Sequence, residues 1–256
     1  MKYRETAVIT EQQKIATDIY SMWLQTERIA GEAVPGQFLS VYSRDESRML
    51  PRPISICQVD QKRGRIRLVY RIAGKGTKEF SGYGTGDTLE IVGPLGNGFP
   101  LDKGYEKVLL IGGGIGIPPM VELSERLSGK KLIVVGYRNS ELFLKEELER
   151  NGELYLASED GSVGTKGNVL DAIHGKKLSG QAIFACGPTP MLRALKTYAA
   201  EQGIDCYLSL EERMACGVGA CLACVCHSMD IDAHTHVKNK RICKDGPVFA
   251  AGEIEL

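Results

Sequence analysis

The chain of 256 residues lacks a long apolar stretch, and it lacks an excess of either charge. Its most apolar run, Val108 to Val121, is interrupted by four glycines and two prolines, whereas a membrane-spanning helix needs about 20 apolar residues. The charged N-terminal segment has no apolar core of the kind a signal peptide requires. Lysine and arginine total 32, as do aspartate and glutamate, which gives no reason to expect nucleic acid or a membrane as a partner. These absences predict a cytoplasmic protein.

Cysteine is abundant in one segment. Five of the eight cysteines fall between Cys216 and Cys243. Disulfides are not expected, because cytoplasmic thiols are kept reduced. The spacing Cys216-x4-Cys221-x2-Cys224, followed after 18 residues by Cys243, is that of plant-type ferredoxins. It predicts a 2Fe-2S cluster held by these four thiolates.

Two alternatives concern this cysteine cluster. Zinc sites usually combine two short-spaced pairs of ligands, and the second half here has a single cysteine, so a non-enzymatic zinc-stapled module is the weaker hypothesis. Cys226 could replace Cys224 as the third ligand, although it lies two residues further on. The nearby histidines are interpreted as solvated loop residues: His227, His234 and His236.

The pattern of predicted secondary structure changes near residue 102. Turn signals separate short alternating segments that predict a small antiparallel β-barrel: Thr6–Thr10, Ile15–Trp23, Gln37–Tyr42, Ile54–Val59, Arg65–Tyr70 and Thr88–Val92. Strands and helices then alternate up to residue 210, which predicts an α/β doubly wound domain. Residues 211–256 are too short for a large core of their own. We therefore predict a multi-domain chain, with a barrel at 1–101, a nucleotide-binding domain at 102–210 and an iron–sulfur domain at 211–256.

A glycine-rich loop follows the apolar strand Lys107–Ile111 and precedes a predicted helix at Pro118–Leu127. Such a loop brings backbone close to a pyrophosphate, which the helix N-terminus favours. A second loop follows another strand, so both should lie at the carboxyl edge of one sheet. The predicted contacts with NAD are Gly112, Gly113, Gly114, Gly116, Cys186, Gly187 and Pro188. Cys186 either faces a nicotinamide or is a buried small hydrophobe.

The choice between NAD and NADP stays open at this point. No acidic residue ends the strand Lys131–Tyr137, where a carboxylate would bind the ribose of NAD, and Arg138 follows instead. Asp160 is an alternative ribose contact, although a turn role is favoured.

Two barrel segments have the character of phosphate and flavin contacts. One is Arg52-Pro53-Ile54-Ser55, and the other runs from Tyr70 to Thr77. Arg52 and Arg71 can bind phosphates through charge-assisted hydrogen bonds, and Gly76-Thr77 can start a short helix. The alternative for either segment is a turn with a solvated arginine.

This combination resembles the ferredoxin–NADP reductase superfamily over residues 1–210. In that superfamily the barrel holds FAD and the second domain holds NAD(P). Ile54 stands where the superfamily usually has an aromatic residue. Residues 211–226 and 243–249 look like the electron-transfer subunit of class B dihydroorotate dehydrogenase. Together with Arg52–Ser55, Leu95–Pro100 and Cys186–Met191, this resemblance covers essentially the whole chain.

The resemblance implies a set of cofactor contacts and a partner. It assigns the four cysteines to 2Fe-2S, and to FAD it assigns Arg52, Pro53, Ile54, Ser55, Val69, Tyr70, Arg71, Gly76 and Thr77. The implied partner is a separate FMN-containing dihydroorotate dehydrogenase catalytic subunit, with two copies of each chain in a heterotetramer. Electrons from dihydroorotate would then reach NAD+ through 2Fe-2S and FAD, in pyrimidine biosynthesis.

Two points remain open beside this resemblance. An NAD(P)H-handling subunit of a hydrogenase or of a ferredoxin-reducing complex would share the same domain plan. Glu211 and Glu212, which precede the cysteine loop, either approach the flavin or nicotinamide or are solvated. No residue is predicted to be catalytic.

Overall fold

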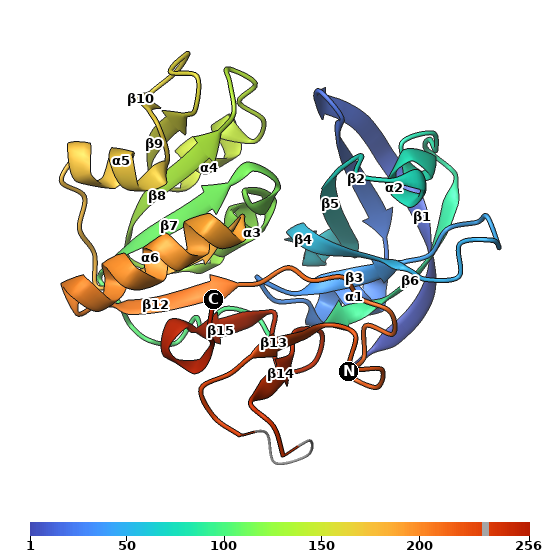
Figure 1. Ribbon diagram of the computed structural model, residues 1–256. Coiled ribbons are helices and arrows are strands. Elements are labelled where there is room, and N and C mark those ends of the chain that lie inside the picture. Colours follow the sequence, from blue (N-terminus) through green and yellow to red (C-terminus); the bar gives the residue numbers. More distant parts are fainter. Residues whose placement is uncertain (232–235) are drawn as a thin grey trace.

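The N-terminal part of the chain forms a closed antiparallel barrel (Figure 1). The computed structural model describes residues 1–231 and 236–256. The strand order is β1-β2-β5-β4-β3-β6, with β1 Tyr3–Ala16, β2 Ile19–Gln25, β3 Phe38–Val41, β4 Arg52–Asp60, β5 Arg65–Arg71 and β6 Thr88–Leu95. The short helices α1 (Glu27–Glu32) and α2 (Lys75–Phe80) and the turn η1 (Gln61–Arg63) connect them.

The barrel is closed around a core of alternating apolar side chains. Ile9, Leu24, Ile56 and Leu68 are among those fully buried inside it, as expected for strands that place every second side chain on one face. The prediction of one strand over Ile15–Trp23 was wrong. A turn divides it between β1 and β2, and Asp18 has a left-handed backbone there.

The second unit is a seven-stranded sheet in the order β10-β9-β8-β7-β11-β12-β15. Its first six strands are parallel: β7 Lys107–Gly113, β8 Lys130–Tyr137, β9 Glu153–Ser158, β10 Thr165–Lys166, β11 Ala182–Cys186 and β12 Asp205–Ser209. One face packs on α3 (Pro118–Arg126) and α4 (Lys145–Asn151), and the other on α5 (Val169–Gly175) and α6 (Thr189–Gln202). The predicted barrel followed by a doubly wound domain is confirmed.

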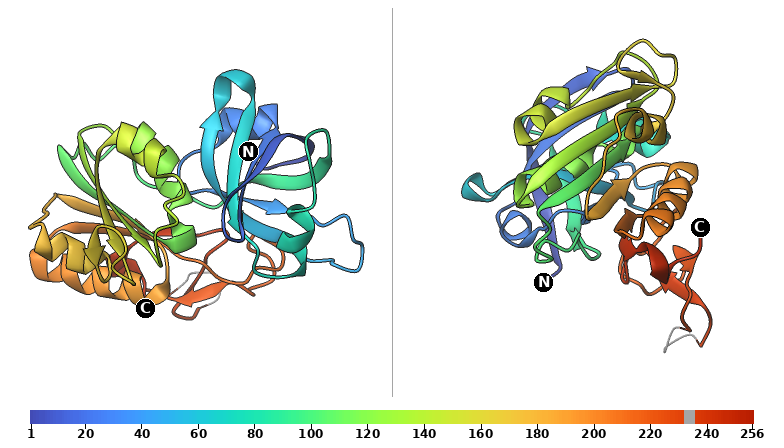
Figure 2. Two further views of the ribbon diagram at one scale, coloured as in Figure 1. Left: turned by 90° about the horizontal axis from the view of Figure 1, so that it is seen from above. Right: turned by 90° about the vertical axis from the view of Figure 1, so that its left-hand side faces the viewer.

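The C-terminal segment lies against both units (Figures 1 and 2). It contains the hairpin β13 (Val225–His227) and β14 (Asn239–Arg241), then β15 (Val248–Ala250) and the turn η3 (Ala251–Glu253). Strand β15 pairs antiparallel with β12 and so adds the last strand to the nucleotide-domain sheet. Cys224 and Cys243 belong to the same buried cluster as Leu208 of the sheet and Leu95 of the barrel. The segment therefore shares its core with its neighbours. The domain boundaries themselves stay a prediction.

Polar contacts hold the barrel against the second unit. Glu122 of α3, only 1% exposed, accepts a hydrogen bond of 2.8 Å from the backbone N–H of Val59. Arg67 of β5 is buried and forms an ion pair of 3.1 Å with Glu147 of α4. Burial raises the pKa of Glu122, and the Val59 N–H opposes the rise. Within the described residues, no helix is long and apolar enough to cross a membrane.

Candidate functional site

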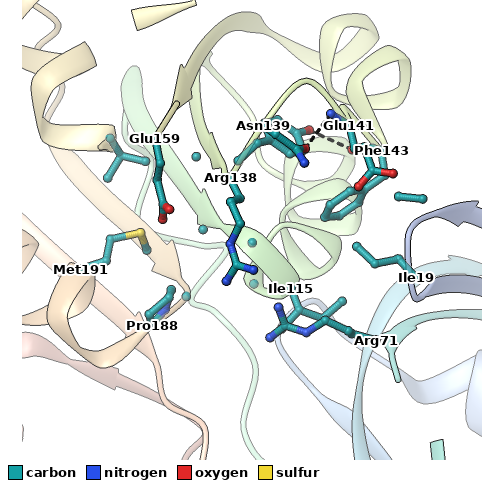
Figure 3. A pocket seen from close by; sticks show the side chains of 18 of the residues that line it. Ile19, Arg71, Ile115, Arg138, Asn139, Glu141, Phe143, Glu159, Pro188 and Met191 are labelled. Atoms are coloured by element: carbon teal, nitrogen blue, oxygen red, sulfur yellow. Dashed lines mark hydrogen bonds between the residues drawn. The ribbon is translucent and has the colours of Figure 1, made fainter. Parts of the chain in front are cut away.

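A cavity of about 620 Å³ lies between the barrel and the carboxyl edge of the parallel sheet (Figure 3). The barrel contributes residues 16–19 of the β1–β2 turn, together with Arg71 at the end of β5. The sheet contributes the loops after β7, β8, β9 and β11. Ligands of open α/β sheets bind outside the carboxyl ends of the strands, and this cavity is in that position.

The two predicted nucleotide loops meet at this cavity. Gly113, Gly114, Gly116, Gly187 and Pro188 line it. A turn, η2 (Gly114–Gly116), leads into α3, and its close contact with β11 requires a glycine. A Cβ on Gly116 would lie 2.4 Å from the carbonyl oxygen of Cys186.

Two residues predicted to contact the nucleotide do not line the cavity. Gly112 is buried in β7, and Cys186 is buried at the end of β11. Burial raises the pKa of the Cys186 thiol, and the nearby Glu211 adds to that rise. Cys186 thus has the environment of a buried small hydrophobe.

Charged residues of opposite sign point into the cavity. Figure 3 shows Arg138, just after β8, and Glu159, just after β9, both directed toward its centre. Glu159 was not among the predicted contacts, because a ribose-binding carboxylate was expected at the end of β8 or at Asp160. The Asp160 carboxylate instead accepts hydrogen bonds from the Ser162 N–H at 2.9 Å and its hydroxyl at 2.7 Å, which closes a turn.

Glu211 connects this cavity to a second one of about 500 Å³. Glu212 lines only the second cavity of the two, which lies between α6, the hairpin β13–β14 and the C-terminal residues. The Glu211 side chain is exposed, but desolvation by the surrounding cavity walls raises its pKa, and the Arg71 guanidinium opposes the rise. Glu211 and Arg71 both line the first cavity, at the junction of the sheet and the barrel.

The predicted flavin segments lie where two barrel strands separate. Residues Arg52–Ser55 of β4 pair with β3, and the register between β4 and β5 begins at Ile56 and Leu68. The last residues of β5, Val69–Arg71, pair with β2 on their other side. Within the described part of the chain, the facing edges of Arg52–Ser55 and Val69–Arg71 are thus not paired with each other. Two backbone edges that do not pair with each other fit a flat, polar-edged ring such as a flavin between them.

The side chains of this region are divided between the surface and the interior. Val69 and Tyr70 are buried, so their side chains belong to the packing. Arg71 is exposed and lines the cavity. Pro53, Ile54 and Ser55 are half-buried along the β4 edge.

Arg52 and the first turn of α2 form a cradle. A Cβ on Gly76 would lie 2.4 Å from Nε of Arg52, so the guanidinium packs directly over this glycine. The buried Thr77 hydroxyl accepts hydrogen bonds from the N–H groups of Ala73 at 2.9 Å and Gly74 at 3.2 Å. A hydrogen-bonded helix start with an arginine guanidinium packed on it fits a pyrophosphate.

The four predicted cluster cysteines lie in two pairs. The Cys216 N–H donates to Sγ of Cys221 at 3.5 Å, and the Cys243 N–H donates to Sγ of Cys224 at 3.4 Å. Val218 and Ala220 also donate their N–H groups to Sγ of Cys216, at 3.4 and 3.3 Å. In the described residues, no three His, Cys, Asp or Glu side chains are placed to hold a single metal ion. Two thiol pairs with backbone N–H donors fit a cluster in which each of two irons takes two cysteines.

The thiols of Cys216 and Cys243 have pKa shifts of opposite direction. Burial opposes ionisation of Cys216, but hydrogen bonds from Val218, Cys221 and Ala220 outweigh it and lower the pKa to about 6. Burial, Cys224 and Cys216 raise the pKa of Cys243 to about 12, while a backbone hydrogen bond from Gly219 opposes the rise.

Cys226 lies apart from these pairs. It is half-buried in β13 opposite Lys240 and lines the second cavity. His227 and His236 are exposed, as predicted, but His227 ends strand β13, so its placement in a loop was wrong. His234 lies outside the described residues.

The cysteine loop packs directly on the barrel. Gly217 has a positive φ of 68°, and a Cβ there would lie 2.6 Å from Oγ of the buried Ser40. Ser40 in β3 pairs with Pro53 of β4, within the predicted flavin segment. One strand therefore separates the loop of the first three cysteines from that segment.

Comparison with known proteins agrees with this architecture. Residues 6–99 match the oxidoreductase FAD-binding domain, and residues 211–255 match the iron-sulfur cluster binding domain of dihydroorotate dehydrogenase B. These matches confirm the predicted FAD-binding and iron–sulfur domains. Among solved structures, an NADH-dependent reduced ferredoxin-NADP oxidoreductase has a TM-score of 0.88 and 30% identity, over 98% of this chain and 90% of that one.

Full-length relatives are closer in sequence. The chain is 42% identical to the dihydroorotate dehydrogenase B (NAD(+)) electron transfer subunit of Geobacillus sp. strain WCH70, and all of both chains is covered. It is 40% identical to the subunit of that name from Bacillus cereus strain B4264, again over all of both chains. The chain therefore belongs to the family of dihydroorotate dehydrogenase B electron transfer subunits.

Proposed function

We propose that this chain is the electron transfer subunit of a class B dihydroorotate dehydrogenase. A separate FMN-containing catalytic subunit would oxidise dihydroorotate, and the electrons would reach NAD+ on this chain. The proposal rests on one observation: the cysteine loop, the predicted flavin segments and the nucleotide cavity lie next to one another. The cysteine loop packs on β3, β3 pairs with the Arg52–Ser55 edge, and Arg71 lines the nucleotide cavity. When bound, an iron–sulfur cluster supplies one-electron transfer, and FAD exchanges single electrons for a hydride.

We assign FAD to the separated edges of β4 and β5 and to the cradle at α2. Arg52 and the backbone around Gly76 and Thr77 would hold the pyrophosphate. The edges at Pro53–Ser55 and Val69–Arg71 would orient the ring through backbone groups. Because Val69 and Tyr70 are buried, they would contribute through the main chain.

We assign the cluster to Cys216, Cys221, Cys224 and Cys243. Sγ of Cys224 contacts the N–H of Cys243, whereas Cys226 lines the second cavity, and this supports Cys224 as the third ligand. Val218 and Leu222 flank these cysteines and are 41% and 45% exposed. Exposed apolar side chains next to a redox centre support docking of the catalytic subunit on this face. A heterotetramer with two copies of each subunit is part of the proposal.

We expect the carboxylate of Glu159 to give a preference for NAD over NADP. A carboxylate directed into the cavity accepts hydrogen bonds from a ribose diol and repels a 2′-phosphate. Glu159→Gln should therefore raise the ratio of kcat/KM for NADPH to that for NADH about tenfold, the equivalent of roughly 1.4 kcal/mol.

The matched control is Asp160→Asn, because this neighbouring carboxylate is held in a turn by Ser162. It should leave the ratio at the wild-type value. A ratio that changes in Asp160→Asn but not in Glu159→Gln would refute the assignment.

The proposal as a whole is tested on the purified chain, alone and with a co-expressed catalytic subunit. Alone, it should contain flavin, iron and acid-labile sulfide, and it should reduce an artificial acceptor with NADH without oxidising dihydroorotate. With the partner, it should couple dihydroorotate oxidation to NAD+ reduction. A preparation with neither flavin nor NADH-dependent reduction of the acceptor would overturn the proposal.

A second function is favoured by one observation, the 30% identity to the NADH-dependent reduced ferredoxin-NADP oxidoreductase. A subunit of a ferredoxin-reducing complex would use the same three regions. Purification from the native cell distinguishes the two functions. A flavin-containing dehydrogenase that acts on dihydroorotate supports the first, and a large iron–sulfur flavoprotein supports the second.

A further inference from the structure

Arg241 is a buried cation beside the cluster cysteines, and the proposed function gives it no role. It ends β14, is 8% exposed, and pairs in register with Val225 of β13. A guanidinium so removed from water needs partners, because burying an unpaired charge is costly. Its identified partners lie on both segments that carry the cysteines.

The first partner belongs to the segment of the fourth cysteine. Nε of Arg241 donates to Oδ2 of Asp245 at 3.0 Å, and Nη2 lies 3.4 Å from Oδ1. The Arg241 backbone N–H donates to the same carboxylate at 2.8 Å, and its carbonyl accepts from the N–H groups of Lys244 and Asp245. These bonds close a tight turn around Cys243.

The second partner belongs to the loop of the first three cysteines. Nη1 of Arg241 donates to the carbonyl oxygen of Gly219 at 3.3 Å. Gly219 lies between Cys216 and Cys221, within the loop that supplies the first three cysteines. Arg241 therefore joins this loop directly to the turn that carries Cys243.

We propose that Arg241 is a positioning residue for the iron–sulfur cluster, which ties the Cys216–Cys224 loop to the Cys243 turn. This inference rests on the proposed function. The planar guanidinium of Arg241 has several N–H donors and can bind the Asp245 carboxylate and the Gly219 carbonyl at the same time. The single ammonium of a lysine cannot replace this arrangement. The guanidinium also bridges the two segments that carry the cysteines, and a positive charge there would favour the addition of an electron and raise the reduction potential of the site.

The test compares Arg241→Lys and Arg241→Gln with a matched control, Lys240→Gln. Lys240 is the preceding residue of the same strand, and its ammonium pairs with Glu253 at 2.6 Å, outside both cysteine segments. Two quantities are measured on the full-length chain: the rate at which visible cluster absorbance is lost to an iron chelator, and the midpoint potential of the cluster by an EPR-monitored titration. Bound flavin serves as the reference for folding.

We expect Arg241→Lys to lose the cluster about 10-fold faster than wild type, since changes beside metal ligands typically cost 10–100-fold. Arg241→Gln should be at least as fast and should also have a lower midpoint potential. Lys240→Gln should match wild type in both quantities. Flavin content should be unchanged in all three variants.

Either of two results would overturn the proposal: a wild-type rate of cluster loss in Arg241→Lys, or an unchanged potential in Arg241→Gln. If Arg241→Gln loses its flavin as well, its fold is disturbed, and the rate of cluster loss in Arg241→Lys then decides whether the proposal holds. If the wild-type chain contains no iron and no sulfide, the proposed function itself fails. Iron and sulfide analysis of the wild-type chain detects that outcome separately.

Discussion

Replacing Cys224 by serine is expected to abolish the iron–sulfur cluster, whereas replacing Cys226 by serine should leave it in place. Cys224 is buried, and its Sγ accepts the N–H of Cys243 at 3.4 Å. Its carbonyl also accepts the N–H of Ile242 at 2.9 Å, so the two segments are already joined at this residue. Serine cannot supply the thiolate that iron–sulfur clusters require. Iron, acid-labile sulfide and visible absorbance of the purified variants measure the outcome.

Cys226→Ser is the matched control because it makes the same change two residues away, on a side chain that lines the second cavity. Both variants should keep their flavin and their NADH-dependent reduction of an artificial acceptor, since neither residue lies in the barrel or lines the nucleotide cavity. Loss of iron and sulfide from Cys226→Ser, with retention in Cys224→Ser, would reverse the ligand assignment.

The second large effect is expected from Gly116→Ala, which should weaken NADH binding and destabilise the nucleotide domain. The added Cβ would lie 2.4 Å from the carbonyl oxygen and 2.5 Å from the carbonyl carbon of Cys186, and 2.6 Å from the amide nitrogen of Gly187. These are backbone atoms, so no side chain can move aside and the two loops must separate. Overpacking of this kind costs about 1–3 kcal/mol. The KM for NADH and the midpoint of thermal unfolding are the measurements.

Gly175→Ala is the control in the same domain. Gly175 ends α5, and among the described residues no heavy atom outside the neighbouring backbone of its own helix lies within 4 Å of a Cβ built there. Alanine is the better helix former, so the variant should unfold at the wild-type temperature or above. A normal KM and a normal unfolding temperature in Gly116→Ala would show that the two loops are not in close contact.

Features that depend on local sequence could be predicted. The strand before Gly112 and the helix after it follow from an apolar run, a glycine loop and a proline at the start of the helix. The structure has β7 at Lys107–Gly113 and α3 at Pro118–Arg126. The cysteine spacing likewise indicates the kind of centre, because it reflects the reach of one short loop.

Features that depend on long-range pairing could not be predicted. The bend of β4, which pairs first with β3 and then with β5, leaves no periodic signal in the sequence. Glu159 reaches the cavity because β9 lies beside β8, and neither residue type nor spacing shows where an exposed glutamate points. Arg241 resembles any charged residue of a short strand, and its role depends on the turn at Asp245 and on Gly219.

The antiparallel pairing of β15 with β12 has a consequence for how the chain folds. Residues 210–247 form an excursion between two neighbouring strands, so the sheet gains its last strand only after the whole cysteine segment has been synthesised. Closing such a loop has an entropic cost that grows with its length. A cluster that joins Cys216 to Cys243 would shorten the loop and lower that cost. Cofactor assembly in one segment would thereby help the last strand of another domain to dock.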